Sequence, residues 1–298
     1  MKVAVMMSTY NGERYLDAQI ESLASQTIAD AITLYIRDDG STDKTFDIIE
    51  KWKSNLHIKL IKGSNLGPAK SFWDLLTNND IQADYYAFCD QDDVWDANKL
   101  EIAISKLNAH THLYACNCRL IDSEGAVIAK KYTENVPEIS IPRLFVAGIA
   151  QGCAMVFTDN LRQFVVSRDL QCIPMHDIMV MLYALGHGDV IWDSETRFGY
   201  RVHSSNVVAR ENKSFIKRVR STYWNWRNSS KNSMSAVAQE MLNKANGLSE
   251  TDVVYLTLIS NYKTNISAKR KLLFQKHTDT IPFRVLNSYR MRLILNLL

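Results

Sequence analysis

Long apolar runs are missing from this 298-residue sequence. No stretch of about 18 consecutive apolar residues occurs, so we expect no membrane-spanning helix. The N-terminal residues, MKVAVMMSTYNG, turn polar too soon for a secretory signal peptide. Internal repeats and low-complexity segments are also missing. The chain is therefore expected to stay in the cytoplasm, on the side of the membrane where it is made.

Cysteine pairs of the kind that bind zinc are missing as well. None of the five cysteines forms a C-x-x-C pair or shows a zinc-like spacing. Their odd number and apolar neighbours predict reduced, buried thiols of a cytosolic protein. These residues are Cys89, Cys116, Cys118, Cys153 and Cys172.

The composition is that of a soluble globular protein, with 46% apolar and 22% charged residues. Charge, however, is unevenly distributed. Residues 1–209 hold 19 Lys and Arg against 27 Asp and Glu, a net charge of −8, whereas residues 210–298 hold 16 against 5, a net charge of +11. This asymmetry predicts two regions, a catalytic domain over 1–209 and a basic region over 210–298 that is attracted to something anionic.

Strand and helix patterns alternate through the first hundred residues. This order predicts an α/β fold, a mostly parallel sheet flanked by helices. Ser41 or Thr42 is expected to cap the second helix. The expected strands are residues 2–7, 32–36, 57–61 and 85–89, and the expected helices are 13–26, 42–52, 68–78 and 96–108.

The pattern is less regular after residue 112. We expect strands at 113–122 and 151–157, helices at 159–166 and 176–188, and two short strands at 189–192 and 196–203. Beyond residue 210 the pattern is helical and basic.

Three polar clusters follow the predicted strands: STYNG (8–12), RDDGSTD (37–43) and DQDD (90–93). Ligands of parallel sheets bind beyond the carboxyl ends of the strands, so the fold is expected to gather these clusters at one rim.

The carboxylates of Asp90, Asp92 and Asp93 lie within four positions, directly after an apolar strand. Like charges this close repel, and a bound divalent cation would resolve the conflict. Carboxylate oxygens suit Mg²⁺ or Mn²⁺, which typically bridge one or two carboxylates to substrate phosphates. The alternative is a solvated acidic turn.

Other polar residues at this rim have alternative interpretations. A carboxylate of Asp38 or Asp39 can accept a hydrogen bond from a nucleoside, or can simply stabilise an Asx turn. Asp177 can be a base or only a helix cap. His203 can be a ligand beside the acidic turn or a structural histidine.

Taken together, these motifs resemble the inverting family 2 glycosyltransferases of the GT-A fold over about residues 2–207. The matching parts are V-x-V-x-M-S-T-Y-N-G-x-x-Y-L (3–16), R-D-D-G-S-T-D-x-T (37–45), N-L-G (65–67), F-C-D-Q-D-D-V-W (88–95), Q-G-C (151–153), H-D (176–177) and Y-R-x-H-x-x-N (200–206). The motifs D-Q-D-D-V-W, H-D and Y-R-x-H are most similar to those of the bacterial branch often labelled rhamnosyltransferase, which builds surface polysaccharides.

The resemblance implies a role for each of these positions. Asp177 would be the general base. The divalent cation, Mg²⁺ or Mn²⁺, would be held by Asp90, Asp92, Asp93 and His203. Acceptor contacts would come from Gln151, Gly152 and His176. The residues that the resemblance places against the nucleotide-sugar are Thr9, Tyr10, Asn11, Asp38, Asp39, Asn65, Gly67, Asp90 and Gln91.

The implied reaction is the inverting transfer of one sugar to a hydroxyl of a glycan or of a glycan linked to a polyprenyl diphosphate. The best candidate donor is dTDP-rhamnose, and a UDP-hexose is the alternative. Processive relatives carry a Q-x-x-R-W-type motif followed by membrane-spanning helices, and this sequence has neither. A single addition per encounter is therefore expected.

The basic region has two interpretations. Segments 214–227 and 284–298 mix Lys and Arg with apolar residues at helical spacing, as in helices that lie on an anionic membrane. The alternative is that they pack on the catalytic domain or form an oligomer. Membrane contact would place the protein peripherally on the inner face of the cytoplasmic membrane.

Two other function classes compete. A phosphatase with an aspartyl nucleophile needs D-x-D-x-[TV] after the first strand, and a sugar nucleotidyltransferase needs a glycine-rich basic loop there; the sequence has S-T-Y-N instead. A nucleic-acid-binding protein is opposed by the net charge of −8 over residues 1–209. We therefore expect no nucleic-acid partner.

Overall fold

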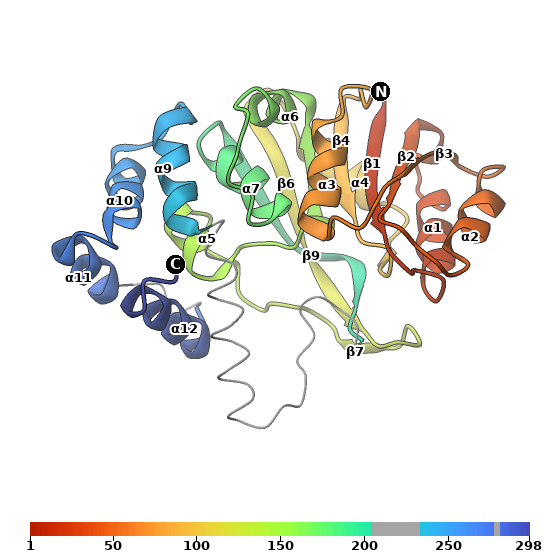
Figure 1. Ribbon diagram of the computed structural model, residues 1–298. Coiled ribbons are helices and arrows are strands. Elements are labelled where there is room, and N and C mark those ends of the chain that lie inside the picture. The colour runs from red at the N-terminus through yellow and green to blue at the C-terminus, as the bar shows by residue number, and fades with distance from the viewer. Residues whose placement is uncertain (204–232, 277–280) are drawn as a thin grey trace.

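The computed structural model describes residues 1–203, 233–276 and 281–298. Its first half alternates strands and helices as the sequence predicts (Figure 1). The elements of this half are β1 (Val3–Thr9), α1 (Leu16–Ala24), β2 (Ile32–Asp38), α2 (Thr45–Trp52), β3 (His57–Lys62), α3 (Pro68–Thr77), β4 (Tyr85–Cys89), β5 (Val94–Trp95) and α4 (Lys99–Lys106).

One nine-stranded sheet organises the fold, in the order β3-β2-β1-β4-β8-β6-β9-β5, with β7 paired to β6. The first four of these strands are mutually parallel. Their register sets Thr9 opposite Asp38 and Met7 opposite Cys89. The loops that follow β1, β2, β3 and β4 therefore leave the sheet at the same edge, which is the lower edge in Figure 1.

The second half adds an antiparallel part. Strand β8 pairs antiparallel with both β4 and β6, and β9 runs parallel to β6. The two short strands expected at 189–192 and 196–203 are wrong: they form one strand, β9, whose register against β6 shifts in between. The elements are β6 (Thr111–Ile121), β7 (Val127–Ala129), α5 (Ile141–Ala147), β8 (Met155–Thr158), α6 (Asp159–Val166), α7 (His176–Leu185) and β9 (Asp189–Arg201).

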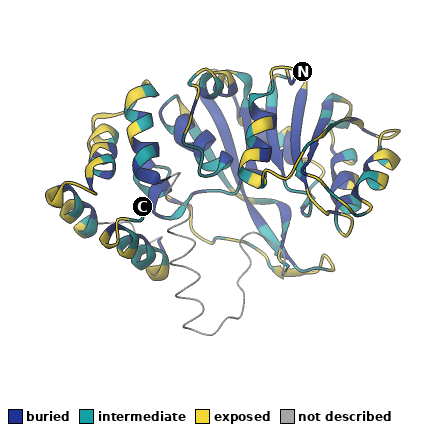
Figure 2. Ribbon diagram, viewed as in Figure 1, coloured by how far each residue is buried: buried dark blue, intermediate teal, exposed yellow. Residues whose placement is uncertain are grey.

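Hydrophobic cores lie on both faces of the sheet (Figure 2). Alternate residues of β1 divide between them: Val3, Val5 and Met7 belong to one core, and Ala4 and Met6 to the other. This is the two-residue period of a strand that is covered on both faces. Helices α1, α2 and α4 cover the first core, and α3, α5, α6 and α7 cover the second.

Four C-terminal helices extend the second core: α9 (Met234–Lys244), α10 (Glu250–Asn261), α11 (Ile266–Phe274) and α12 (Phe283–Ile294). The ring of Tyr255 in α10 meets that of Phe145 in α5, with centroids 5.8 Å apart. The described part of the basic region thus packs on the rest of the protein. Segment 214–227 lies outside the described residues. None of the described helices is long and apolar enough to cross a membrane.

Candidate active site

The loop after β2 is anchored by Asp38. Its buried carboxylate accepts hydrogen bonds from Thr9 Oγ1 at 3.0 Å, from the Ser41 N–H at 2.8 Å and from the Gly40 N–H at 3.0 Å. The Ser41 hydroxyl donates to the same side chain at 2.5 Å. The sequence assigned Ser41 or Thr42 to cap the next helix, and this is wrong: α2 begins at Thr45 with no side-chain cap. Asp38 therefore joins the ends of β1 and β2.

The neighbouring Asp39 reaches the loop after β3. Its carboxylate accepts from the N–H groups of Leu66 and Gly67, the latter at 2.8 Å. The buried Arg37 guanidinium pairs with Asp39 and, through Nε at 2.7 Å, with Asp74. Sequence reasoning gave Arg37 no role, although an arginine before two aspartates at the end of a buried strand was a usable signal. Asn65, in the same loop, is exposed.

The loop after β1 meets the acidic turn through Tyr10 and Gln91. The Tyr10 N–H donates to Gln91 Oε1 at 2.9 Å, and Gln91 Nε2 donates to the Tyr10 carbonyl at 3.2 Å. A Cβ on Gly12 would stand 2.5 Å from Gln91 Oε1, so a larger residue there would displace the Gln91 side chain. The Tyr10 side chain remains about half exposed. Asn11, with φ of 48°, accepts from the Thr42 N–H at 2.9 Å.

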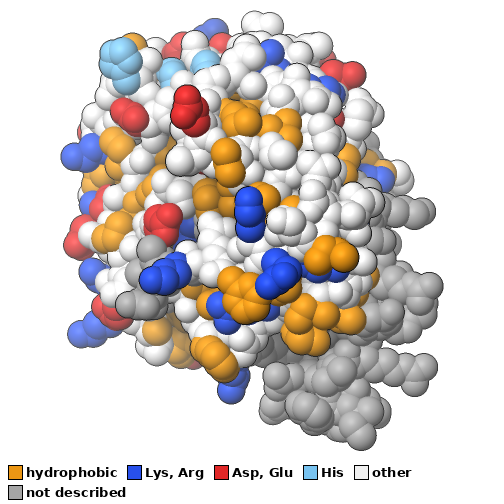
Figure 3. Space-filling view, turned by 90° about the vertical axis from the view of Figure 1, so that its left-hand side faces the viewer, with side chains coloured by type: hydrophobic (Ala, Val, Ile, Leu, Met, Phe, Trp, Pro, Cys, Tyr) orange, Lys and Arg blue, Asp and Glu red, His pale blue; other side chains and the backbone are white. Residues whose placement is uncertain are grey.

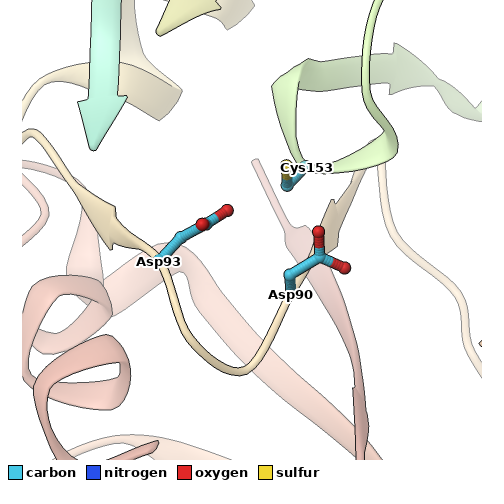
Figure 4. A group of neighbouring side chains, drawn as sticks. All are labelled: Asp90, Asp93 and Cys153. Atoms are coloured by element: carbon cyan, nitrogen blue, oxygen red, sulfur yellow. The ribbon is translucent and has the colours of Figure 1, made fainter. Parts of the chain in front are cut away.

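The acidic turn itself brings Asp90 and Asp93 to face Cys153 (Figure 4). Their ligand atoms all lie within 4.8 Å of one another. Asp93 is fully buried; Oδ1 accepts from the Arg201 N–H at 3.1 Å, whereas Oδ2 has no hydrogen-bond partner within the described residues. Cys153 belongs to the short 3₁₀ turn Gly152–Ala154, where a strand was expected. Its neighbourhood with the two carboxylates was not foreseen from the sequence.

Burial, together with the charges of Asp92 and Asp177, raises the pKa of Asp90 to about 7, although a hydrogen bond from Cys153 acts in the opposite direction. Burial, with the charges of Asp90 and Asp92, holds the pKa of Asp93 well above its usual range. A carboxylate pair that is desolvated, mutually repelling and short of a donor is what a bound cation would stabilise. Burial also raises the pKa of the Cys153 thiol, which therefore stays protonated and makes a poor ligand.

Asp92 faces His203, which arrives from the end of β9. The imidazole Nε2 lies 2.7 Å from Asp92 Oδ2. The His203 ring packs on Tyr15, with centroids 4.8 Å apart, and the Arg201 guanidinium lies over the same tyrosine ring at 4.7 Å. The structure thus brings two sequence-predicted metal residues, 111 positions apart, into direct contact. Carboxylate and imidazole together suit Mn²⁺ and, with oxygen ligands dominating, Mg²⁺.

A buried amine lies behind the acidic turn. Lys99, the first residue of α4, is fully buried, and its Nζ has no hydrogen-bond partner in the described part of the chain. It lies 3.2 Å from the centroid of the Trp95 ring. Burial lowers the pKa of Lys99, while nearby thiols and Asp93 act in the opposite direction. No pattern in the sequence distinguishes this lysine from those on the surface.

The start of α7 borders the acidic turn from the other side. Asp177 is half-buried, lies close enough to Asp90 to raise its pKa, and accepts from the Ile178 N–H at 2.8 Å. Gly152 is buried against this helix, and Gln151, which precedes it, is partly exposed. The structure therefore gathers Asp90, Asp177 and Gly152 from three separate elements.

His176 lies deeper than the sequence suggested. Its ring is 4% exposed, stacks on Phe72 with centroids 4.2 Å apart and meets the edge of Phe88 at 4.6 Å. Burial lowers its pKa to about 4, so the imidazole is neutral at pH 7. A direct acceptor contact through this ring stays a prediction; the observed contacts support the N-terminal turn of α7.

Comparisons with known proteins agree on the family. The model of glycosyl transferase family 2 matches residues 4–161. The chain is 28% identical to the dTDP-rhamnosyl transferase RfbG of Shigella flexneri over 216 residues, 68% of this chain and 73% of that protein. It is 27% identical to the poly(ribitol-phosphate) beta-N-acetylglucosaminyltransferase TarS of Staphylococcus aureus over 145 residues, 47% of this chain and 25% of that protein.

Solved structures agree on the fold. TarS residues 1–349 match with a TM-score of 0.62 at 18% identity, covering 99% of this chain and 89% of that chain. The mannosyltransferase PcManGT of Pyrobaculum calidifontis, in complex with GDP-Man and Mn²⁺, matches with a TM-score of 0.54 at 15% identity, covering 99% of this chain and 74% of that one. The predicted GT-A fold is confirmed.

Proposed function

Because this chain belongs to glycosyl transferase family 2 and is a glycosyltransferase, we propose that it transfers one sugar, with inversion, from a nucleotide-sugar to a glycan hydroxyl. The best candidate donor is dTDP-rhamnose, which the likeness to RfbG supports. The alternative is a UDP-hexose, since a TarS structure of the same fold is in complex with UDP-GlcNAc. The product would belong to a bacterial surface polysaccharide.

One observation carries this proposal: Asp177 from α7 stands beside the acidic turn that follows β4, close enough for its charge to raise the pKa of Asp90. Transfer to an alcohol needs a base for the incoming hydroxyl and charge stabilisation for the leaving diphosphate. Asp177 would meet the first requirement, and Asp90, with the cation it would help to hold, the second. The two carboxylates are neighbours and come from different elements.

A divalent cation fits the donor side of the site. Asp90, Asp92 and His203 would hold it, with the buried Asp93 behind them. When bound, it would stabilise the negative charge that develops on the leaving nucleoside diphosphate. Protein residues would orient this group: the Tyr10–Gln91 pair and the Asp39–Gly67 contact link the four loops that follow β1, β4, β2 and β3, where the nucleotide would bind.

Asp177 would act on the acceptor. Its carboxylate takes the proton of the acceptor hydroxyl as that oxygen bonds to the anomeric carbon, while the bond from the anomeric carbon to the diphosphate breaks. Attack from the face opposite the leaving group inverts the anomeric centre. Such base assistance contributes about 10²–10⁴ in rate. The acceptor would be a glycan, free or linked to a polyprenyl diphosphate, bordered by Gln151 and Gly152.

A donor panel tests the proposal. Purified protein is incubated with UDP-, GDP- and dTDP-sugars, with Mn²⁺, with Mg²⁺ or with EDTA, and release of the nucleoside diphosphate is measured. We expect cation-dependent release from one donor, dTDP-rhamnose first, and none with EDTA. Release of inorganic phosphate, or of a nucleoside monophosphate with a sugar phosphate, would overturn it in favour of a phosphatase or a pyrophosphate-cleaving enzyme.

A further inference from the structure

Helices α11 and α12 carry large apolar side chains on their outer sides. Ile266, Phe274 and Phe283 are 77%, 79% and 74% exposed. Along α11, Ile266, Arg270 and Phe274 are four residues apart and all exposed, while Leu272 turns into the core. Met291, Ile294 and Leu295 extend the apolar surface at the end of α12. The two helices are neighbours, joined by Lys269 Nζ, which donates to Asn296 at 2.7 Å.

The same surface is cationic. The described residues 253–276 and 281–298 hold eight Lys and Arg and no Asp or Glu. Of these, Arg270, Lys271, Lys276 and Arg284 are exposed on or beside the two helices. Figure 3, which views this end of the molecule, shows apolar and basic side chains intermingled across its lower part. Large apolar side chains held out among cations are costly in water and mark a contact surface.

We propose that this surface, formed by the outer sides of α11 and α12, docks on an anionic lipid bilayer. The Phe and Ile side chains would enter the interface, and the cations would meet the lipid phosphates. A second copy of the chain is disfavoured, because a two-fold contact would set the same cations against each other. Nucleic acid is disfavoured by the exposed aliphatic side chains and by the net charge of −8 over residues 1–209.

Helices α11 and α12, which carry the docking surface, lie at the left-hand end of the molecule in Figure 1, the end that Figure 3 views. The purpose of docking, access to a lipid-linked acceptor, rests on the proposed function. Binding to the bilayer depends only on the residues of α11 and α12.

Vesicle sedimentation of the full chain tests the inference without donor or acceptor. We expect binding to vesicles that contain phosphatidylglycerol, little binding to pure phosphatidylcholine, and release at high salt. The pair Arg270→Gln with Lys271→Gln and the pair Phe274→Ser with Phe283→Ser should each weaken binding by about tenfold or more. The matched controls, Lys106→Gln with Lys130→Gln and Val127→Ser with Ile128→Ser, change exposed residues elsewhere and should bind as the wild type.

Equal binding by the α11–α12 variants and their controls, or no binding to anionic vesicles, would overturn the inference. The inference would also be overturned if the α11–α12 variants lost a dimer while vesicle binding stayed unchanged. Tight binding to DNA instead of to vesicles would overturn it as well. Thermal unfolding confirms that each variant is folded. Hydrolysis of the donor in the absence of lipid should be unchanged in all four double variants, the two on α11 and α12 and the two controls. Failure of the membrane inference and failure of the proposed function are therefore separate results.

Discussion

Nε2 of His176 lies 2.8 Å from the position that a Cβ atom on Gly152 would occupy. Such a Cβ would also stand 3.3 Å from that of Asp177. The 3₁₀ turn and the start of α7 are therefore packed together without room for a methyl group at Gly152. The position of Asp177 relative to Asp90 depends on this close approach.

Replacing Gly152 with alanine should displace the first turn of α7. We expect the rate of sugar transfer to fall by about tenfold or more, since small misplacements of a catalytic group are costly, while the protein stays folded. Steady-state kinetics together with thermal unfolding measure both effects. The control is Gly186→Ala at the other end of α7, where the nearest atom is the mobile end of Leu248 at 3.3 Å. Equal activity losses in the two variants would contradict this explanation.

Asp177→Asn keeps the size of the side chain and removes the base. The transfer rate should drop by about 10²–10⁴, with donor affinity nearly unchanged, because the donor contacts come from other loops. Asp189→Asn, at an exposed position beyond the other end of α7, is the control. Transfer at a near-normal rate by a correctly folded Asp177→Asn protein would remove the assigned base.

Cation binding should depend on Asp92 and His203. Calorimetric titration with Mn²⁺ is expected to detect one site in the wild-type protein, and a site weakened by about tenfold or more in Asp92→Asn and in His203→Ala. EDTA should abolish transfer, and added Mn²⁺ should restore it. Asp47→Asn, an exposed change on α2, should bind Mn²⁺ normally. Unchanged Mn²⁺ affinity in both site variants would place the cation elsewhere.

Arg37→Lys should destabilise the protein although the charge is kept. A lysine cannot reproduce the two-sided contact with Asp39 and Asp74, and the buried Asp39 would lose its cationic partner while keeping the N–H donors of Leu66 and Gly67. We expect a loss of about 2–4 kcal/mol in the free energy of unfolding and a higher KM for the donor. Arg14→Lys, whose pair with Glu124 is exposed, should cost less than about 0.5 kcal/mol in urea unfolding. A loss at Arg37 as small as that at Arg14 would contradict the inferred pairing.

Glu240 should make stability depend on pH in the acid range. Burial alone would raise its pKa, but hydrogen bonds from the Gln171 N–H, Lys244 and the Cys172 N–H outweigh burial and lower the pKa. Its contribution is therefore complete above the ordinary value of 4.5 and is lost as the pH falls through the lowered pKa. Glu240→Gln should cost about 1–2 kcal/mol at pH 7, and the difference from wild type should shrink in unfolding curves below pH 4. A difference independent of pH would refute this.

Local patterns in the sequence were enough for the first half of the fold. The strands expected at 57–61 and 85–89 were found at His57–Lys62 and Tyr85–Cys89, because a doubly covered strand needs a short, continuous apolar run. The alternation of strands and helices also predicted that Thr9, Asp38 and Asp90 share one rim, since parallel strands end at the same edge of a sheet. The family motifs added the order in which the polar clusters occur.

Only the tertiary structure decided which side chains contact one another and which hydrogen bonds they form. Ser41 or Thr42 was expected to cap a helix, and Ser41 instead donates to Asp38. Cys153, from the turn before β8, lies beside two aspartates, and Lys99 is buried. The short strands of 189–203 join because β6 offers one continuous edge. Periodicity records which side of an element is apolar, whereas hydrogen-bond partners and desolvation depend on segments distant in the chain, which no local pattern specifies.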